Sequence, residues 1–362
     1  MPTGPFPDAT SELDLLRREY ESSLSWRVTR PLRALGHRAR GLRPRPSTDA
    51  GGWTPPATFT PGRYDSWLAD LHGERLDRID AACADAGGPG AFALFRDLDA
   101  DLWALLLTQD YEVYPNIRAL LPDVPDPSLQ QLWNGASGAR LAEQSGSFYS
   151  KLCQRFRAHG ATSLPEARVL DFGCGWGRLT RFLARDVEPG ALYGCDPVEA
   201  ILDVCRDSGV PATLARTDFV PDRLPFDEPF DLAFAFSVFT HLSETAHLAC
   251  LRALHAALRP GGILVVTVRP PEYLQFCALL HPVLRSLGPD YRARVQEPRY
   301  LFAAHDAYPG HPQYTRGEMA YGETVVTLGY VRERWAEMFE LLDVDVLIGD
   351  LFQVALTLRR TL

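Results

Sequence analysis

Short apolar runs alternate with amphipathic, helix-like stretches through the second half of the chain. The apolar runs occupy residues 169–172, 191–195, 212–215, 230–237 and 263–268. Runs of about four to eight residues are typical of strands buried on both faces, and the stretches between them repeat apolar residues at helical spacing. This alternation predicts an α/β fold with a parallel sheet and right-handed crossovers. Two last runs, 341–348 and 353–358, flank Gly349 and Asp350 and predict an antiparallel hairpin that closes the sheet.

The chain before these strands has a different pattern. Residues 61–164 repeat apolar side chains at helical spacing, interrupted by prolines, and predict a helical cap. Residues 1–60 combine a short amphipathic stretch with a run of arginines between positions 27 and 45 that contains no acid, followed by a linker rich in Gly and Pro. We therefore expect a basic N-terminal arm and linker over 1–60, the cap over 61–164, and the α/β domain over 165–362 with an insert at about 270–329.

A glycine-rich loop follows the first predicted strand. Residues 169–178 read Val-Leu-Asp-Phe-Gly-Cys-Gly-Trp-Gly-Arg, so Asp171 lies near the strand end and glycines alternate at 173, 175 and 177. Such glycines let a ligand approach the main chain, and free N–H groups at a helix start near Arg178 favour an anionic group. The dinucleotide fingerprint requires glycine at position 178, and no phosphate-binding Gly-Lys-Ser or Gly-Lys-Thr run is present. We expect a different ligand, one that carries a carboxylate or phosphate.

This loop resembles motif I of the class I S-adenosylmethionine-dependent methyltransferases. Asp196 ends the second run about 20 residues past the glycines, where a carboxylate can accept both ribose hydroxyls. Asp218 with Phe219, the 230–237 run and the Pro-Gly-Gly at 260–262 match later landmarks in order, over roughly residues 165–270. The resemblance implies a Rossmann-like, seven-stranded methyltransferase sheet with an N-terminal helical cap and an insert after strand five. It also implies S-adenosyl-L-methionine as cofactor.

The family resemblance places the cofactor contacts at the carboxyl ends of the strands. The residues implied to bind the cofactor are Asp171, Phe172, Gly173, Cys174, Gly175, Gly177, Asp196, Pro197, Asp218, Phe219 and Ser237. Among them, Asp196 is expected at the ribose, and Asp218 with Phe219 at the adenine. Trp133 and Tyr149 precede the first strand and are expected either in the core or over the cofactor.

Methyl transfer from a sulfonium mainly requires alignment of the acceptor with the methyl group. A hydroxyl acceptor also needs a base within hydrogen-bond reach. The sequence offers His241 after the fourth strand, and His305 and Glu318 in the insert, as catalytic candidates, with Asp306 and His311 as further options. His305, Asp306, Glu318 and Glu323 carry atoms that magnesium accepts as ligands, but their spacing does not define a site, so no metal site is assigned and metal dependence is left open.

Composition narrows the functional classes. The net charge of -9 argues against nucleic-acid binding by the body of the protein, and residues 237–239 do not form the Asn-Pro-Pro-Tyr type of motif used on flipped bases. The seven cysteines are scattered and contain no Cys-x-x-Cys pair, which argues against a disulfide frame or a zinc knuckle. No apolar run is long enough for a membrane span, and residues 1–10 lack a signal-peptide layout, so we expect a cytoplasmic protein.

The sequence of the N-terminal arm indicates a class of molecule that could accept the methyl group. Residues 25–33, Ser-Trp-Arg-Val-Thr-Arg-Pro-Leu-Arg, resemble a segment that recurs beside glycosyltransferase and methyltransferase domains of bacterial surface-polysaccharide assembly proteins. This favours O-methylation of a sugar or glycan intermediate, with the arm either solvated or in peripheral contact with the inner membrane face or an assembly partner. Two alternatives stay open: a secondary-metabolite O-methyltransferase, and a non-catalytic scaffold recruited through the arm. Formation of a homodimer is also left open.

Overall fold

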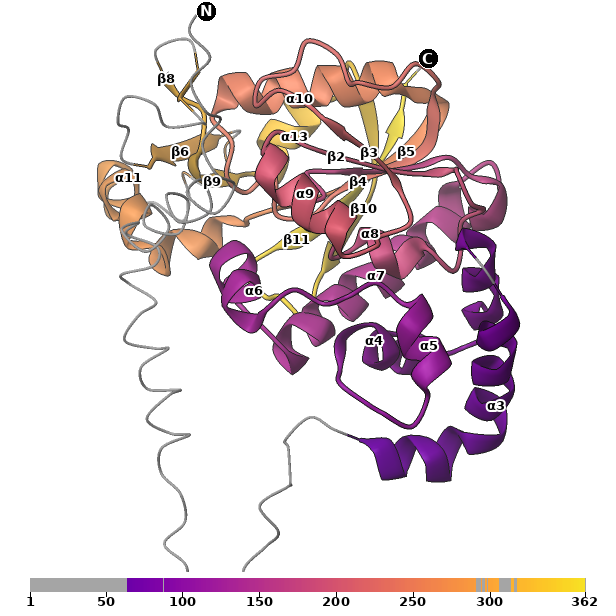
Figure 1. The fold of residues 1–362 in the computed structure, drawn as a ribbon. Coiled ribbons are helices and arrows are strands. Elements are labelled where there is room, and N and C mark those ends of the chain that lie inside the picture. The colour runs from indigo at the N-terminus through magenta and orange to yellow at the C-terminus, as the bar shows by residue number, and fades with distance from the viewer. Residues whose placement is uncertain are drawn as a thin grey trace, which may run out of the picture.

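The computed structural model describes residues 64–361, except residues 87, 291–293, 295–296, 298, 306–313 and 316–317. The predicted N-terminal arm therefore lies outside the described residues, as do Asp306 and His311. Glu318 lies in a short strand, but its side chain is also outside the description. Figure 1 shows an α/β body with a group of helices at one end and a small β-rich region at the side.

Seven strands of the described chain form one main sheet in the order β10-β11-β5-β4-β1-β2-β3. Their bounds are β1 (Val169–Phe172), β2 (Leu192–Asp196), β3 (Thr213–Arg216), β4 (Phe230–Ala235), β5 (Leu258–Val268), β10 (Phe339–Val346) and β11 (Val354–Arg360). β1 to β5 pair in parallel, whereas β11 pairs antiparallel with both β5 and β10. The Rossmann-like sheet and its closing hairpin are confirmed. Parallel order brings the carboxyl ends of β1, β2, β4 and β5 to one edge, where ligands of such sheets bind.

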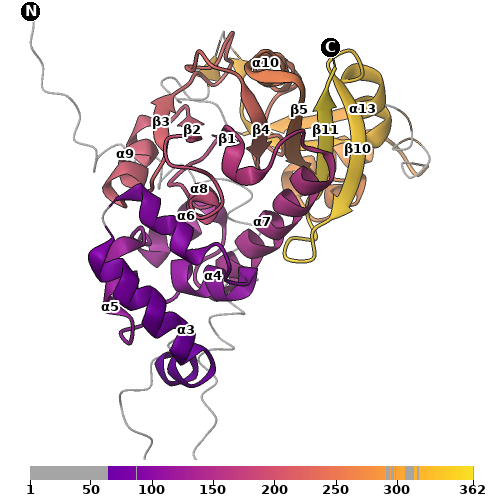
Figure 2. The ribbon, with the colours of Figure 1, turned by 90° about the vertical axis from the view of Figure 1, so that its right-hand side faces the viewer.

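Successive residues of the strands point to opposite faces of the sheet, and each face has its own core. Val169, Leu232 and Ile263 belong to a cluster with the N-terminal helices, whereas their neighbours Leu170 and Leu264 belong to a second cluster on the other face. The near-continuous apolar character of these strands follows from this double burial. Figure 2 shows the sheet with β10 and β11 at one end and β3 at the other.

The N-terminal helical region packs against the first face. It consists of α3 (Asp65–Asp85), η1 (Pro89–Phe95), α4 (Ala100–Thr108), α5 (Pro115–Leu120), α6 (Pro127–Asn134), α7 (Ala139–His159) and η2 (Leu164–Glu166). α7 contacts both α4 and β5, so it joins these helices to the sheet. Figures 1 and 2 place α3, α4 and α5 at the end of the molecule far from α10 (Glu244–Ala257). The predicted helical region is therefore confirmed.

The remaining helices are α8 (Thr180–Leu183), α9 (Glu199–Asp207) and α13 (Leu328–Arg334). The insert after β5 contains η3 (Pro271–Gln275), η4 (Ala278–Leu280), α11 (His281–Ser286), β6 (Tyr300–Ala304), β7 (Tyr314–Thr315), β8 (Glu318–Met319) and β9 (Gly322–Val326). β6 and β9 pair antiparallel, separate from the main sheet. Among the described helices, none is long and apolar enough to cross a membrane.

The helix after the glycine loop is shorter than the sequence predicted. The sequence predicted a helix from about Arg178 whose free N–H groups would bind an anion. The helix that follows, α8, spans only four residues. The N–H groups of Gly173 and Cys174 instead donate to the carbonyl of Cys195 at 2.8 and 3.1 Å. The N–H groups of Gly173 and Cys174 are therefore already used within the protein, and the expected anion contact at the helix start stays a prediction.

Candidate active site

The glycine loop is held against the end of β2 by hydrogen bonds that include a buried carboxylate. Asp196 accepts from the N–H of Gly175 through Oδ2 at 3.0 Å and from the N–H of Val198 through Oδ1 at 2.9 Å. Its side chain is only 6 % exposed. Because each carboxylate oxygen has more than one lone pair, both can still accept a ligand hydroxyl. The expected ribose contact stays a prediction with a suitable geometry.

Glycine is required in this loop by both backbone conformation and crowding. Gly173 and Gly175 have positive φ values of 76° and 54°. A Cβ at Gly173 would lie 2.4 Å from Cγ2 of Val238, and one at Gly175 would lie 2.7 Å from Nε1 of Trp133. The loop is therefore in contact with the segment after β4 on one side and with α6 on the other.

A second carboxylate lies one strand away. Asp171 is 2 % exposed and accepts a hydrogen bond from the Thr180 hydroxyl at 2.6 Å. Burial raises the pKa of Asp171 to about 7, which the Thr180 bond and the charge of Arg178 offset only in part, while the neighbouring charge of Asp196 raises it further. Burial likewise raises the pKa of Asp196 to about 6. Two buried acids that resist ionisation fit a ligand with positive charge, such as a sulfonium or an ammonium group.

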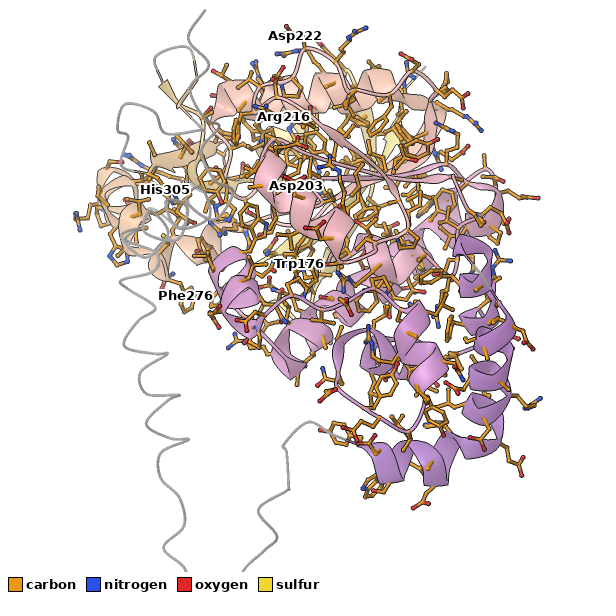
Figure 3. All side chains as sticks on the ribbon, viewed as in Figure 1. Trp176, Asp203, Arg216, Asp222, Phe276 and His305 are labelled. Atoms are coloured by element: carbon orange, nitrogen blue, oxygen red, sulfur yellow. The ribbon has the colours of Figure 1, made fainter. Side chains whose placement is uncertain are left out.

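α6 covers the glycine loop. Trp176 of the loop donates its indole N–H to Oδ1 of Asn134 at 2.8 Å. Trp133, Trp176 and Phe219 share one apolar cluster with residues of α9. Trp133 therefore lies at the loop, as one of its two sequence readings expected, whereas Tyr149 is a core residue, 4 % exposed and bonded to Asp186 at 2.6 Å. Figure 3 shows Trp176 near the middle of the molecule, close to α9.

The other predicted cofactor residues are spread around this loop. Phe172 and Cys174 are buried in the core beside it, Pro197 follows Asp196 and is partly exposed, and Asp218 is exposed on the loop after β3. Ser237, past the end of β4, has a positive φ of 61°, which is unusual for a residue with a side chain. Its N–H donates to the Thr267 hydroxyl at 2.7 Å, so a bond to β5 fixes this conformation.

The acceptor side of the site is formed where the insert meets the ends of β4 and β5. Glu323 of β9 is 1 % exposed and forms an ion pair with Arg269, the residue after β5. The Tyr273 hydroxyl lies 3.4 Å from Oε2 of Glu323, and the Arg269 guanidinium lies 4.2 Å from the centre of the Tyr273 ring. Gly322 and Thr324 of β9 donate backbone N–H groups to the carbonyls of His241 and Thr240. β9 is thus attached to the loop that follows β4.

Two of the predicted catalytic residues meet at this carboxylate. Nδ1 of His241 lies 3.9 Å from Oε1 of Glu323, and Nε2 of His305 lies 3.5 Å from the same oxygen. Tyr321 stacks on His241 and contacts His305 edge-on, with ring centres 5.0 and 5.2 Å apart. The sequence placed these residues far apart, and the fold brings them together. Figure 3 shows His305 on the side of the molecule where β6 and β9 lie.

Sequence reasoning missed Arg269 and gave Glu323 only as one member of an unspecific metal-ligand set. The sequence context of each of these two residues did contain an indication of its role. Arg269 directly follows the apolar run of the fifth strand, and Glu323 is the charged residue inside the otherwise uncharged sequence Gly-Glu-Thr-Val-Val. A charge within a buried strand requires a partner, because an unpaired buried charge is costly. What the sequence could not show was that each of these residues is the other's partner.

Comparison with known proteins agrees with this geometry. Residues 169–262 match a methyltransferase domain family. The chain is 35% identical over 135 residues to a trans-aconitate 2-methyltransferase of Variovorax paradoxus, covering 37% of this chain and 49% of the relative. It is 31% identical over 150 residues to the ubiquinone/menaquinone biosynthesis C-methyltransferase UbiE of Ectopseudomonas mendocina, covering 39% and 54%. The chain thus spans about half the length of these curated relatives.

Among solved structures, magnesium protoporphyrin IX methyltransferase (ChlM) of Synechocystis with bound SAH is similar at 17% identity and a TM-score of 0.41, over 67% of this chain and 92% of that one. This overall similarity is too low to bear on the site. The assignment rests instead on the matched residues 169–262, which include the glycine loop, Asp196, β4 and His241. Residues 169–262 of this chain therefore match a methyltransferase domain, and the sheet that contains them has the Rossmann-like methyltransferase fold.

Proposed function

We propose that this protein transfers a methyl group from S-adenosylmethionine to a hydroxyl of a sugar or glycan intermediate in surface-polysaccharide assembly. The observation that carries the methyl-transfer proposal is the juxtaposition at one sheet edge. The glycine loop and Asp196 lie at the ends of β1 and β2, and Val238, which would meet a Cβ at Gly173, lies three residues before His241. A methyl donor on the loop would thus face the polar residues of the insert.

When bound, S-adenosylmethionine would supply a methyl group on a positively charged sulfur. Asp196 would accept the ribose hydroxyls, and Asp171 would contribute negative charge beside the same loop. Phe219 would offer an apolar surface to the adenine, since it belongs to the cluster with Trp133 and Trp176. His241, His305 and Glu318 are the proposed candidates for removal of the acceptor proton.

The proposal of a glycan acceptor is supported by the N-terminal segment of the sequence, and not by similarity within the methyltransferase domain. The relatives named above are a trans-aconitate methyltransferase and a quinone C-methyltransferase, so similarity in this domain is compatible with different acceptors. The segment at 25–33 supports a glycan acceptor. The histidines and tyrosines of the insert also suit an acceptor rich in hydroxyl groups, because they can both donate and accept hydrogen bonds.

We also propose that the protein is cytoplasmic and that the arginine-rich residues of the N-terminal arm contact an anionic membrane surface or an assembly partner. Lys and Arg clusters bind the negative surface of the inner leaflet. Sedimentation with vesicles of neutral and of anionic lipid would test this contact. A homodimer is compatible with the proposal, and light scattering of the purified protein would measure its oligomeric state.

The experiment that tests the function is transfer of labelled methyl from S-adenosylmethionine into an extract of the source organism. The extract is separated into lipid-linked glycan, nucleotide-sugar and small apolar fractions. Label in either sugar fraction supports the proposal and identifies the stage that is modified. Label only among small apolar compounds favours a secondary-metabolite acceptor, and binding of the cofactor without any labelling favours a scaffold. Asp203→Asn, an exposed change on α9, serves as the matched active control.

A further inference from the structure

The turn between β10 and β11 exposes a group of large apolar side chains. Ile348 is 84 % exposed and Leu351 is 70 % exposed, and Val346 and Phe352 beside them are also exposed. The ring of Phe276, an exposed residue that follows η3 in the insert, packs edge-on against the Phe352 ring with ring centres 5.4 Å apart. We call these five residues the apolar rim. Figure 3 shows Phe276 at the margin of the insert.

Polar contacts hold the turn that carries the rim in place. Asp350 accepts through Oδ2 from the side-chain amides of Gln144 on α7 and of Gln353, both at 2.7 Å. Its Oδ1 accepts from the N–H of Phe352 at 3.1 Å. Gly349 lies so close to α7 that a Cβ there would be 3.0 Å from a side chain of that helix. The rim is therefore presented to solvent by an anchored turn, as is typical of a surface that binds something.

The rim borders the acceptor side of the site. β11 begins opposite the last residue of β5, so the turn before it lies at the carboxyl edge of the parallel strands. Gln353, the residue after the rim, is buried and donates to the Ser237 hydroxyl at 3.3 Å. Phe352 also contacts the ring of Tyr273, whose hydroxyl lies 3.4 Å from Glu323. A molecule that enters the acceptor side would therefore extend over the rim.

The composition around the rim fits an apolar chain. Residues 270–280 and 346–353 contain two acids, Glu272 and Asp350, and no Lys or Arg. Glu272 is exposed, so a phosphate group at the rim would meet a negative charge and no cation from these two segments. A nucleotide sugar, which carries a charged diphosphate, is therefore a poor match. A hydrocarbon chain would instead remove the rim from water, with a gain that grows with the length of the chain.

We propose that the apolar rim holds the hydrocarbon chain of an amphiphilic acceptor whose hydroxyl-bearing head enters the site. This inference rests on the proposed function, and it selects the lipid-linked glycan among the acceptor stages considered there. The rim begins one residue from the buried Gln353, so polar and apolar surfaces follow each other directly. An amphiphile presents its head and chain in the same order.

The first test measures binding of the chain without methyl transfer. The full-length protein is titrated in a calorimeter with maltose and with hexyl, octyl and decyl maltoside, each below its micelle concentration. Affinity should rise about two- to fourfold for each added CH₂. Leu351→Ser should lower the affinity for decyl maltoside by about tenfold. Leu71→Ser, which removes a leucine of similar exposure, 65 %, from α3, should leave it unchanged.

Three results of the binding experiments would overturn the inference. The first is an affinity that does not depend on chain length, or that falls equally in the two variants. The second is sedimentation with neutral vesicles that contain no glycan, if Leu351→Ser abolishes it, because the rim would then contact the membrane surface itself. The third is a wild-type dimer, measured by light scattering, that Leu351→Ser converts to a monomer, because the rim would then contact a second copy of this chain.

The second test is kinetic and separates this inference from the proposed function. Label from S-adenosylmethionine should enter the lipid-linked fraction. Leu351→Ser should raise the apparent KM for the lipid-linked acceptor by about tenfold, with the KM for the cofactor unchanged. Label in the nucleotide-sugar fraction alone would overturn the inference and leave the proposed methyl transfer intact. A protein that binds the alkyl maltosides as expected but methylates nothing would refute the proposed function and support the assignment of the rim.

Discussion

The two sides of this site balance their buried charges in different ways. On the cofactor side, Asp171 and Asp196 are buried at the ends of adjacent strands, and their pKa values are raised because burial outweighs the stabilising contacts. On the acceptor side, Glu323 is equally buried but has Arg269 as a direct partner. The acceptor side is therefore electrostatically complete in the protein alone. The cofactor side is completed only when a positively charged ligand arrives, which is a physical reason for it to bind one.

The largest effect on stability is expected from breaking the ion pair between Arg269 and Glu323 on the acceptor side. Arg269→Met leaves Glu323 as an unpaired buried carboxylate, which should lower the free energy of unfolding by about 3 to 5 kcal/mol. Urea denaturation measures this loss. The double change that also converts Glu323 to Gln should recover most of it, because neither charge then remains. A single variant within about 1 kcal/mol of the wild type would show that the pair is not buried as described.

A smaller effect, on cofactor affinity, is expected from removing the Asp196 carboxylate on the cofactor side. Asp196→Ala should weaken S-adenosylmethionine binding by about 2 to 3 kcal/mol, since hydrogen bonds to a charged group contribute roughly that much. Calorimetric titration measures the affinity, and circular dichroism checks that the variant is folded. The exposed Asp203→Asn is the control. Unchanged affinity in Asp196→Ala would contradict the ribose assignment.

The smallest effect is a gain in stability, which we expect when the buried carboxylate of Asp171 is replaced. The folded pKa of Asp171, about 7, lies above the ordinary value of 3.8 for this side chain, so the folded protein binds more protons than the unfolded chain between these values. Without ligand, stability should therefore fall as pH rises through that window. Asp171→Asn should remove this loss and raise the free energy of unfolding by about 1 kcal/mol at pH 8. A thermal melt series from pH 5 to 8 that shows no difference in slope between variant and wild type would refute this explanation.

The same contrast explains which parts were predictable from the sequence. The strand, glycine loop and Asp196 follow one another within about 30 residues, and hydrophobic pattern with glycine spacing is enough to place them. Conversely, Arg269 and Glu323 are separated by more than 50 residues and meet through β9, whose attachment to the loop after β4 uses backbone hydrogen bonds that leave no sequence pattern.

The expected anion contact of the glycine loop was also a local inference, and it stays a prediction. The glycine loop was expected to leave N–H groups free for an anion, because the residues after it have helical spacing. In the structure α8 is only four residues long, and the N–H groups of the loop find acceptors at Cys195 and Asp196. A pattern of residue types identifies the loop, but it does not reveal which of the loop's donors are already used.

The most direct test of the account is whether the protein releases protons when S-adenosylmethionine binds. Titration calorimetry at pH 6.5, in buffers with different ionisation enthalpies, gives the number of protons exchanged. A cationic ligand beside Asp171 and Asp196 should lower their pKa values, so the wild type should release protons, and Asp171→Asn should release fewer. Binding with no proton exchange, or with equal release in both proteins, would contradict the claim that the ligand completes the charge of the cofactor side.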